Sequence, residues 1–162
     1  MSHESRLTQV LRELLNTSRV AALGTCNPDG TPFVSMVPFA IEPQGGAIVI
    51  HVSALAPHTG NLQSSPAVSL LVMQAETVGE AVHALPRVSL DGTAHVLTDH
   101  NPALPQARRS YLKRFPEAEP MVSFGDFVFV TITVTTARQV AGFGAARTLD
   151  AQEIAQVLQG AA

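Results

Sequence analysis

The chain has 162 residues, enough for one domain with a hydrophobic core but too few for two domains of ordinary size. Hydrophobic residues make up 46% of it and charged residues only 14%, which excludes a disordered chain and favours a homo-oligomer that covers apolar surface. The net charge of −3, without any run of Lys or Arg, excludes a protein that binds nucleic acid by neutralising phosphates. We therefore expect a single domain over residues 1–162.

The same features predict where the protein resides. Cys26 is the only cysteine, which excludes an internal disulfide framework and agrees with a reducing compartment; at the end of a predicted strand, we expect it to be a buried, inert thiol. The first six residues show no basic-then-apolar signal segment, and no apolar run approaches the ~20 residues that cross a bilayer. We expect a cytoplasmic protein with no membrane partner.

The first part of the chain predicts a helix followed by a hairpin. Residues 4–16 place their leucines and valine at helical spacing, which predicts an amphipathic helix lying on a sheet. The turn signal Asn-Pro-Asp-Gly over 27–30 joins an apolar run over 19–26 to a strand over 31–41. Two prolines in the second strand indicate an edge, a strand start or a bulge, because proline donates no ladder hydrogen bond.

The next stretch predicts an anion site. An apolar strand over 47–53 passes through a short turn into a helix over 57–64, with a proline at the first helical position, where proline is favoured. The free N–H groups and the positive dipole end of such a helix attract anions, and Ser53, His58 and Thr59 add side-chain donors. We predict that this turn holds a cofactor phosphate; ordinary helix capping beside a surface histidine is the alternative.

The remainder completes a mainly β fold with flanking helices. Strands are predicted over 67–73, 87–97 with a bend at Gly92, and 124–136 with a continuation over 138–140; helices over 101–115 and after Asp150; and a tight turn over 142–144. About six strands joined largely by hairpins, with helices at the rims, favour a small antiparallel barrel over a doubly wound α/β sheet.

An ordered set of segments also carries a family resemblance. The segments are residues 19–25, 29–39, 53–62, 65–72, 87–92, 111–118 and 142–144. With them the chain resembles the pyridoxamine 5′-phosphate oxidase-like superfamily, the FMN-binding split barrels, and within it the haem-utilisation branch. The resemblance covers roughly residues 5–155.

This resemblance implies a fold and a cofactor. It implies a six-stranded antiparallel split β-barrel that pairs as a homodimer, with FMN sites at the subunit interface. In that family the second strand of the hairpin lies along the flavin ring, and the later strand end and helix start bind the ribityl phosphate. The FMN-binding residues implied are Ser35, Met36, Val37, Pro38, Val52, Ser53, His58 and Thr59.

The chain also departs from the family pattern. The vitamin B6 oxidases place Arg-Lys where this chain has His58-Thr59, and Arg where it has Ser35, so charged donors to a dianion are missing. It has no Trp and no match to the C-terminal Trp and Arg of those enzymes, which argues against a B6 substrate. Haem-degrading relatives use a C-terminal His as iron ligand, and residues 101–162 contain none. That argues against haem degradation and leaves haem binding through another residue open.

The other polar residues predict no further site. The six histidines show no metal-ligand spacing, so no metal is expected, and His95 and His100 are expected to be solvated. Asn61 is expected on a helix surface, and Ser35 has an ordinary strand serine as its equal alternative. No catalytic residue stands out, which agrees with a flavin enzyme because the flavin carries the redox chemistry.

Three functions follow from these observations. The leading hypothesis is an FMN-dependent oxidoreductase acting on an unidentified small-molecule substrate. The second is a flavin- or haem-binding protein without turnover, and the third is a cofactor-free barrel that serves as an interaction domain.

Overall fold

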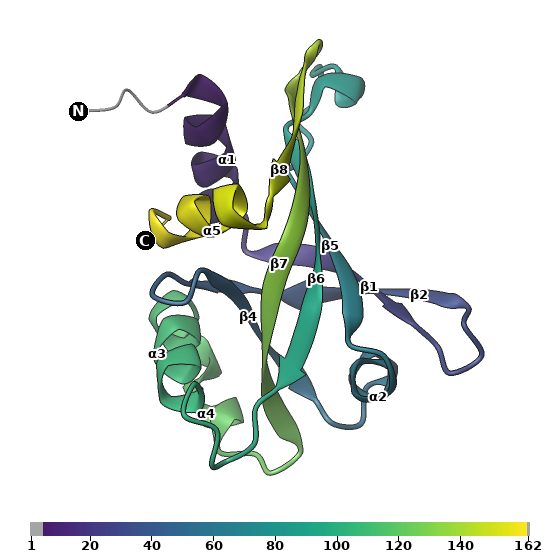
Figure 1. Cartoon of the computed structure of the whole chain (residues 1–162), viewed down its shortest axis with the longest axis vertical. Helices are drawn as coiled ribbons and strands as arrows, with labels where there is room; N and C mark the ends of the chain where they lie inside the picture. Colours follow the sequence, from purple (N-terminus) through teal and green to yellow (C-terminus); the bar gives the residue numbers. More distant parts are fainter. Residues whose placement is uncertain (1–4, 162) are drawn as a thin grey trace.

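The computed structural model describes residues 5–161 and contains one curled antiparallel sheet (Figure 1). Its strands follow the order β2-β1-β5-β6-β7-β4-β3, and β8 pairs with the outer part of β7. The strands are β1 (Val20–Cys26), β2 (Pro32–Pro38), β3 (Ala40–Glu42), β4 (Ala47–Ser53), β5 (Ala67–Met73), β6 (Arg87–Val96), β7 (Phe127–Gly142) and β8 (Ala145–Asp150). The predicted mainly β split-barrel architecture with flanking helices is confirmed.

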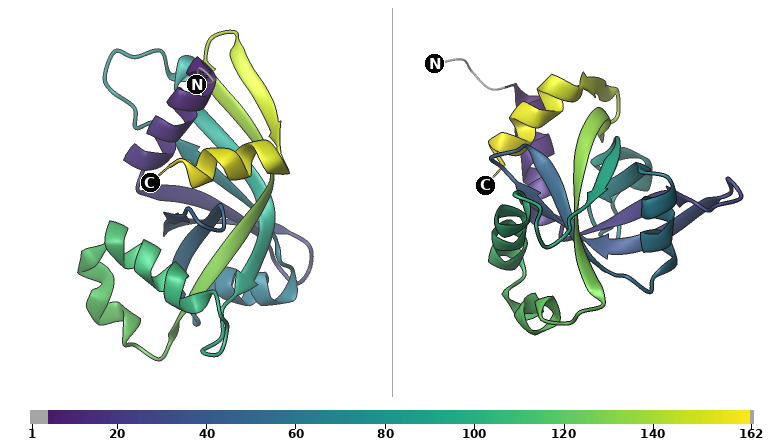
Figure 2. Two further views of the ribbon diagram at one scale, coloured as in Figure 1. Left: turned by 60° about the vertical axis from the view of Figure 1, so that its left-hand side comes forward. Right: turned by 60° about the horizontal axis from the view of Figure 1, so that its bottom comes forward.

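Helices cover the rims of the sheet. They are α1 (Arg6–Thr17), α2 (Pro57–Ser64), α3 (Leu104–Arg114), α4 (Glu119–Val122) and α5 (Ala151–Gln159), with two short 3₁₀ segments, η1 (Val82–Ala84) and η2 (Pro116–Ala118). Figures 1 and 2 show α1 beside α5 at one end of the sheet and α3 with α4 at the other. None of the helices within residues 5–161 is long and apolar enough to span a membrane.

The strand count is eight rather than the predicted six. The strand predicted over 31–41 divides at Phe39, because β2 pairs with β1 whereas β3 pairs with β4 on the far side of the sheet. The second addition is β8, which returns along β7 after the turn at Gly142 and Gly144. Its sequence, Ala-Ala-Arg-Thr-Leu-Asp, contains one large apolar residue and no alternating apolar pattern, so this stretch shows no strand signal in the sequence.

Several local predictions are confirmed. The strands over 47–53 and 67–73 and the helix over 57–64 have the predicted bounds. A register shift between Asp91 and Gly92 is the expected bend, and a Cβ at Gly92 would lie 2.4 Å from the backbone oxygen of Thr133. Asp150 begins α5 in a capping box with Glu153. The prediction for Cys26 is wrong, because its side chain is exposed at the end of β1.

Strand β4 is buried on both faces and joins two hydrophobic cores. Ile48 and Ile50 belong to the larger core, which includes the apolar faces of α1 and α5. Val49 belongs to a smaller core beneath α3, together with Phe129. Successive strand side chains point to opposite faces, so His51 lies on the same face as Val49, toward α3. The fold thereby places a histidine between a strand and a helix.

Candidate functional site

A cavity of about 340 Å³ lies where β2, β4, the start of α2 and the segment from α3 to α4 meet. Most of its lining is apolar or aromatic, namely Met36, Val37, Pro38, Val52, Ala56, Tyr111, Phe115, Ala118, Met121 and Phe127. The other four lining residues are polar, namely His51, Ser53, His58 and Glu117. A mostly apolar hollow with a few convergent polar groups is typical of a cofactor or ligand site.

Most of the residues predicted to bind a cofactor meet at this cavity. Strand β2 contributes Met36, Val37 and Pro38, and the end of β4 contributes Val52 and Ser53. Helix α2 contributes its second residue, His58. These residues come from two segments that are separated along the chain, and the curl of the sheet brings them to one hollow.

Ser35 forms a hydrogen bond with the ring of His58. The Ser35 Oγ lies 3.0 Å from His58 Nδ1, whereas His58 Nε2 is buried with no hydrogen-bond partner within residues 5–161. Burial lowers the pKa of His58 below its ordinary value, so the ring is neutral at neutral pH. When Nδ1–H donates to Ser35, Nε2 carries a free lone pair. A buried polar atom without a partner is costly, which points to a ligand at this position.

Thr59 does not face the cavity. Its side chain is fully buried, with 0% of its surface exposed, and its hydroxyl donates to the Ser53 carbonyl oxygen over 2.6 Å. The Ser53 hydroxyl accepts from the Leu55 amide at 3.2 Å. Ala56 begins α2 without a side-chain cap. The two hydroxyl groups therefore shape the turn between β4 and α2, and only Ser53 also lines the hollow.

Asn61 is buried rather than on the helix surface, so this prediction is wrong. Its amide Nδ2 donates to the Thr25 hydroxyl and to the Asn27 side-chain oxygen, both over 3.0 Å. These bonds tie α2 to the end of β1. They fix the helix that carries His58, and a buried amide with both bonds made is a structural anchor.

His51 lines the cavity and was not among the predicted site residues. Only 6% of its surface is exposed, and its ring stacks on Phe129 with centroids 4.3 Å apart. Tyr111 also contacts this pair, with its ring centroid 5.7 Å from that of His51 and 5.8 Å from that of Phe129. Burial, followed by the nearby charge of Arg108, lowers the pKa of His51, so this ring is also neutral. The sequence signal that could have identified His51 as a site residue is its position inside an otherwise apolar strand.

The cavity contains no cation. None of its lining residues is Lys or Arg, and its one charged residue, Glu117, accepts a bond from Arg19 over 2.6 Å. The Arg19 guanidinium also lies 4.8 Å from the centre of the Phe115 ring. Burial, with a smaller contribution from Glu117, raises the pKa of Tyr111 to about 12. The site is therefore neutral and aromatic, with two uncharged imidazole rings.

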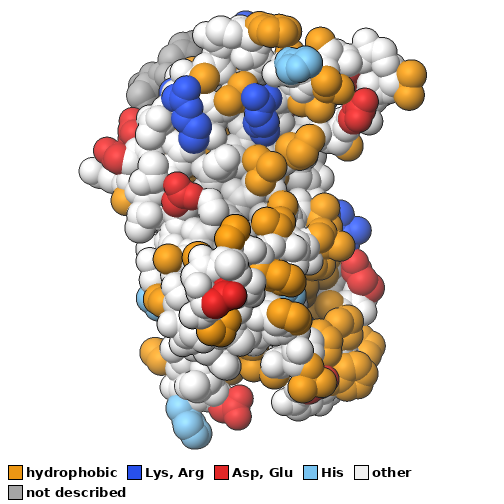
Figure 3. Space-filling view, turned by 90° about the vertical axis from the view of Figure 1, so that its right-hand side faces the viewer, with side chains coloured by type: hydrophobic (Ala, Val, Ile, Leu, Met, Phe, Trp, Pro, Cys, Tyr) orange, Lys and Arg blue, Asp and Glu red, His pale blue; other side chains and the backbone are white. Residues whose placement is uncertain are grey.

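An apolar surface adjoins the cavity. Met36, of which 64% is exposed, lines both the cavity and a groove of about 690 Å³ beside β1 and β5. Figure 3 shows hydrophobic side chains gathered toward one side of this face, beside a notch in its outline. The exposed large apolar side chains of β1, β2 and β5 are Val20, Val34, Met36, Leu71 and Met73. Exposed apolar patches on proteins are typical of surfaces that bind a partner or a ligand.

The remaining candidates lie apart. His95 and His100 are exposed, as expected. Among residues 5–161, no three His, Cys, Asp or Glu side chains are grouped so that they could hold a metal ion.

Known proteins resemble this chain over most of its length. It is 34% identical to the chloroplastic non-canonical haem oxygenase HOZ of Arabidopsis thaliana over 88% of this chain, which spans only 43% of that protein. It is 27% identical to the haem oxygenase HutZ of Vibrio cholerae, over 88% of this chain and 81% of HutZ.

A solved structure shares the fold. The haem-binding protein from Mycobacterium smegmatis superposes with a TM-score of 0.83 at 25% identity, over 95% of this chain and 62% of that one. The match that decides the family is the one to pyridoxamine 5′-phosphate oxidase, which extends over residues 7–141. The chain therefore belongs to the pyridoxamine 5′-phosphate oxidase family.

Proposed function

We propose that this protein binds haem in the cavity between β2, β4 and α3, with His58 as the ligand to the iron. The observation that carries the proposal is the Ser35–His58 pair. Iron-ligating imidazoles are typically oriented by a hydrogen bond to the second ring nitrogen, and His58 has that bond at Nδ1 and a buried, unpartnered Nε2.

The lining fits a haem group in other respects. Its aromatic and aliphatic side chains suit the flat faces of a macrocycle, and its neutral histidines suit iron. None of the lining residues is Lys or Arg, so the two carboxylates of haem would need partners outside these residues. The haem-binding and haem oxygenase relatives support the same assignment.

The residues have distinct roles in this proposal. Ser35 orients the His58 ring, and Asn61 fixes the helix on which His58 stands. His51, stacked on Phe129, forms a rigid wall of the cavity. Haem, when bound, supplies iron for one-electron and oxygen chemistry, while the protein supplies orientation and exclusion of water.

We further propose that a second copy of the chain covers the apolar groove and completes the cavity. Met36 belongs to both hollows, so a partner seated on β1, β2 and β5 would also border the cofactor. A volume of about 340 Å³ in one chain is small for a macrocycle, which agrees with a site shared by two subunits. Light scattering at micromolar concentration should give the mass of a dimer; a monomer mass overturns this proposal.

FMN-dependent oxidation or reduction of a small substrate is a second candidate. The uncapped start of α2 and the Ser53 hydroxyl favour it, because helix N-termini bind phosphate. Against it stands the missing cation, since a buried dianion gains most from charged donors. Flavin binding would therefore depend on backbone N–H groups.

A pair of titrations separates the two candidates. Purified protein is titrated with haemin, followed by the Soret band, and in parallel with FMN, followed by flavin fluorescence. We expect a saturating Soret shift at about one haem per chain and weak or absent quenching of FMN. Saturation with FMN alone reverses the assignment, and saturation with neither leaves only the cofactor-free barrel.

Two variants test whether His58 is the ligand to the iron. Ser35→Ala should weaken haem binding by about tenfold or more, because it removes the bond that orients His58. His95→Ala, which removes an exposed histidine from β6, is the matched control and should bind haem as the wild type does. Equal affinity in the Ser35 variant would move the iron ligand elsewhere in the cavity.

A further inference from the structure

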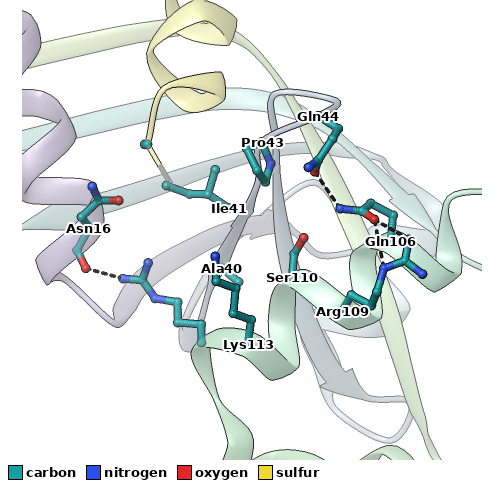
Figure 4. A pocket seen from close by; sticks show the side chains of 11 residues that line it. Asn16, Ala40, Ile41, Pro43, Gln44, Gln106, Arg109, Ser110 and Lys113 are labelled. Carbon is teal, nitrogen blue, oxygen red and sulfur yellow. Dashed lines mark hydrogen bonds between the residues drawn. The ribbon is translucent and has the colours of Figure 1, made fainter.

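A second hollow lies on the other side of α3 from the cofactor cavity. Its volume is about 510 Å³, and it lies between α3, the β3 strand with its following turn, the end of α1 and the C-terminal segment (Figure 4). Helix α3 faces it with Gln106, Arg109, Ser110, Lys113 and Arg114, which recur at helical spacing. The opposite side of the same helix carries Tyr111 toward the cofactor cavity, and Phe115, directly after the helix, lines that cavity as well.

The lining of this second hollow is positively charged. It contains Arg109, Lys113 and Arg114 but no Asp or Glu. The nearest acidic residue along the chain, Glu42, accepts bonds from the Gln44 and Gly45 amides at 2.8 and 2.7 Å and is not part of the lining. Three cations gathered without an acid are unexpected in a protein of net charge −3.

The cations are oriented but not neutralised. Arg109 Nε donates to the Gln106 side-chain oxygen over 3.1 Å, and the Gln106 amide donates to Gln44 over 2.6 Å (Figure 4). Neither Arg109 nor Lys113 has an ion pair within residues 5–161, whereas Arg108 on the same helix pairs with Glu119 at 3.5 Å. The hydrogen bonds thus hold a guanidinium in place while its charge stays uncompensated.

Arg114 adds a second, independent observation. Its Nη2 donates to the carbonyl oxygens of Leu15, Asn16 and Ser18 at the end of α1, yet its Nε is buried with no partner among residues 5–161. A buried charged donor without an acceptor is costly. An anion in this hollow would relieve the repulsion among the three cations.

We propose that this hollow is a binding site for a small organic anion with a carboxylate or phosphate head group. Guanidinium and ammonium groups bind both head groups, the former through paired N–H donors. Ala40, Ile41 and Pro43 form an apolar wall that would contact the body of the ligand. The volume lies within the range of small-molecule sites. The site is separate from the cofactor cavity and does not depend on what that cavity binds.

The chain offers an unusually direct probe of this site, because Lys113 is its only lysine. Reductive methylation with ¹³C-formaldehyde labels Lys113 and keeps its charge, and Lys113→Arg identifies its signal by removing it. The labelled protein is titrated by NMR with citrate, with phenyl phosphate and, at matched ionic strength, with sodium chloride. We expect a saturating shift with citrate or phenyl phosphate, and the one that saturates at lower concentration identifies the head group.

Charge variants complete the test. Arg109→Gln should weaken the anion's binding by about tenfold or more, since it removes a charge-assisted hydrogen bond. Arg138→Gln removes the same charge from the exposed face of β7, outside the hollow, and should leave the binding unchanged. A Lys113 shift that merely follows ionic strength, or an equal affinity in the two variants, overturns the proposal.

Discussion

Helix α3 separates two hollows that differ in almost every physical property. The cavity on one side is neutral and aromatic, and its walls are parts of the hydrophobic core. The hollow on the other side is basic, and two of its three cationic residues, Arg109 and Lys113, are exposed at the surface. One amphipathic helix therefore serves two environments. We therefore expect changes in the cavity to lower stability, whereas changes at the exposed Arg109 and Lys113 should have little effect on it.

The largest effect should come from the aromatic ring that supports His51 in the cavity wall. Phe129 stacks on His51 within the smaller core, so Phe129→Ala should lower the free energy of unfolding by about 3–5 kcal/mol. Phe143→Ala removes the same ring from a side chain that is 79% exposed and should change stability little. Denaturant unfolding measures both, and equal losses would contradict a cavity built from the core.

A smaller loss should follow when α2 is released from β1. Asn61→Ala breaks one buried and one part-buried hydrogen bond and leaves the Thr25 hydroxyl without its partner, which should cost about 1–3 kcal/mol of unfolding free energy. Gln63→Ala, at an exposed position of the same helix, is the control and should be nearly neutral. If both variants unfold alike, the helix that carries His58 is held by other contacts.

The histidines of the cavity predict a pH dependence. Burial lowers the pKa of His51 and His58 below 6.5, so the folded state binds fewer protons than the unfolded state as the pH falls. Stability is unaffected well above pH 6.5 and decreases between that value and the lower folded-state pKa of each ring.

Unfolding curves between about pH 7 and pH 5 test this expectation, because histidine dominates titration there. His51→Phe keeps an aromatic ring in the stack and should flatten the dependence. His95→Gln, at an exposed site, should leave it as in the wild type. A His51→Phe protein with the wild-type slope would show that His51 does not titrate on unfolding.

The smallest effect should come from the basic hollow. Lys113→Gln removes an exposed ammonium group that has no ion pair within residues 5–161, so we expect its unfolding free energy to stay within about 0.5 kcal/mol of the wild type. Thermal unfolding in low salt measures this change. A loss comparable to that of Asn61→Ala would mean that the hollow, too, is part of the folded framework.

The sequence predicts those parts of the fold whose signals are local. The strand over 47–53, the helix over 57–64 and the capping box at Asp150 each carry their apolar pattern, proline or acidic cap in the segment itself. Strand β8 has no such pattern. It is a strand because it pairs with β7, and its own side chains give no indication of this. The break at Phe39 is likewise set by the change of partner strand.

The residues of the candidate site also divide into those that a local signal predicts and those that only the fold brings together. Ser53 and His58 could be predicted because they lie only five positions apart, across one turn. Tyr111 reaches the cavity from a helix far along the chain, and only the curl of the sheet brings it to His51. The wrong prediction for Asn61 has the same cause, since its partners Thr25 and Asn27 lie on a distant strand end.

The central claim is that His58 provides the iron ligand of a haem site. The most direct measurement is the absorption and electron paramagnetic resonance spectrum of the ferric haem complex in His58→Ala, before and after imidazole is added. We predict that the variant loses the wild-type spectrum and that imidazole, entering the vacated space, restores it. A His58→Ala complex whose spectrum equals that of the wild type without imidazole would contradict the claim.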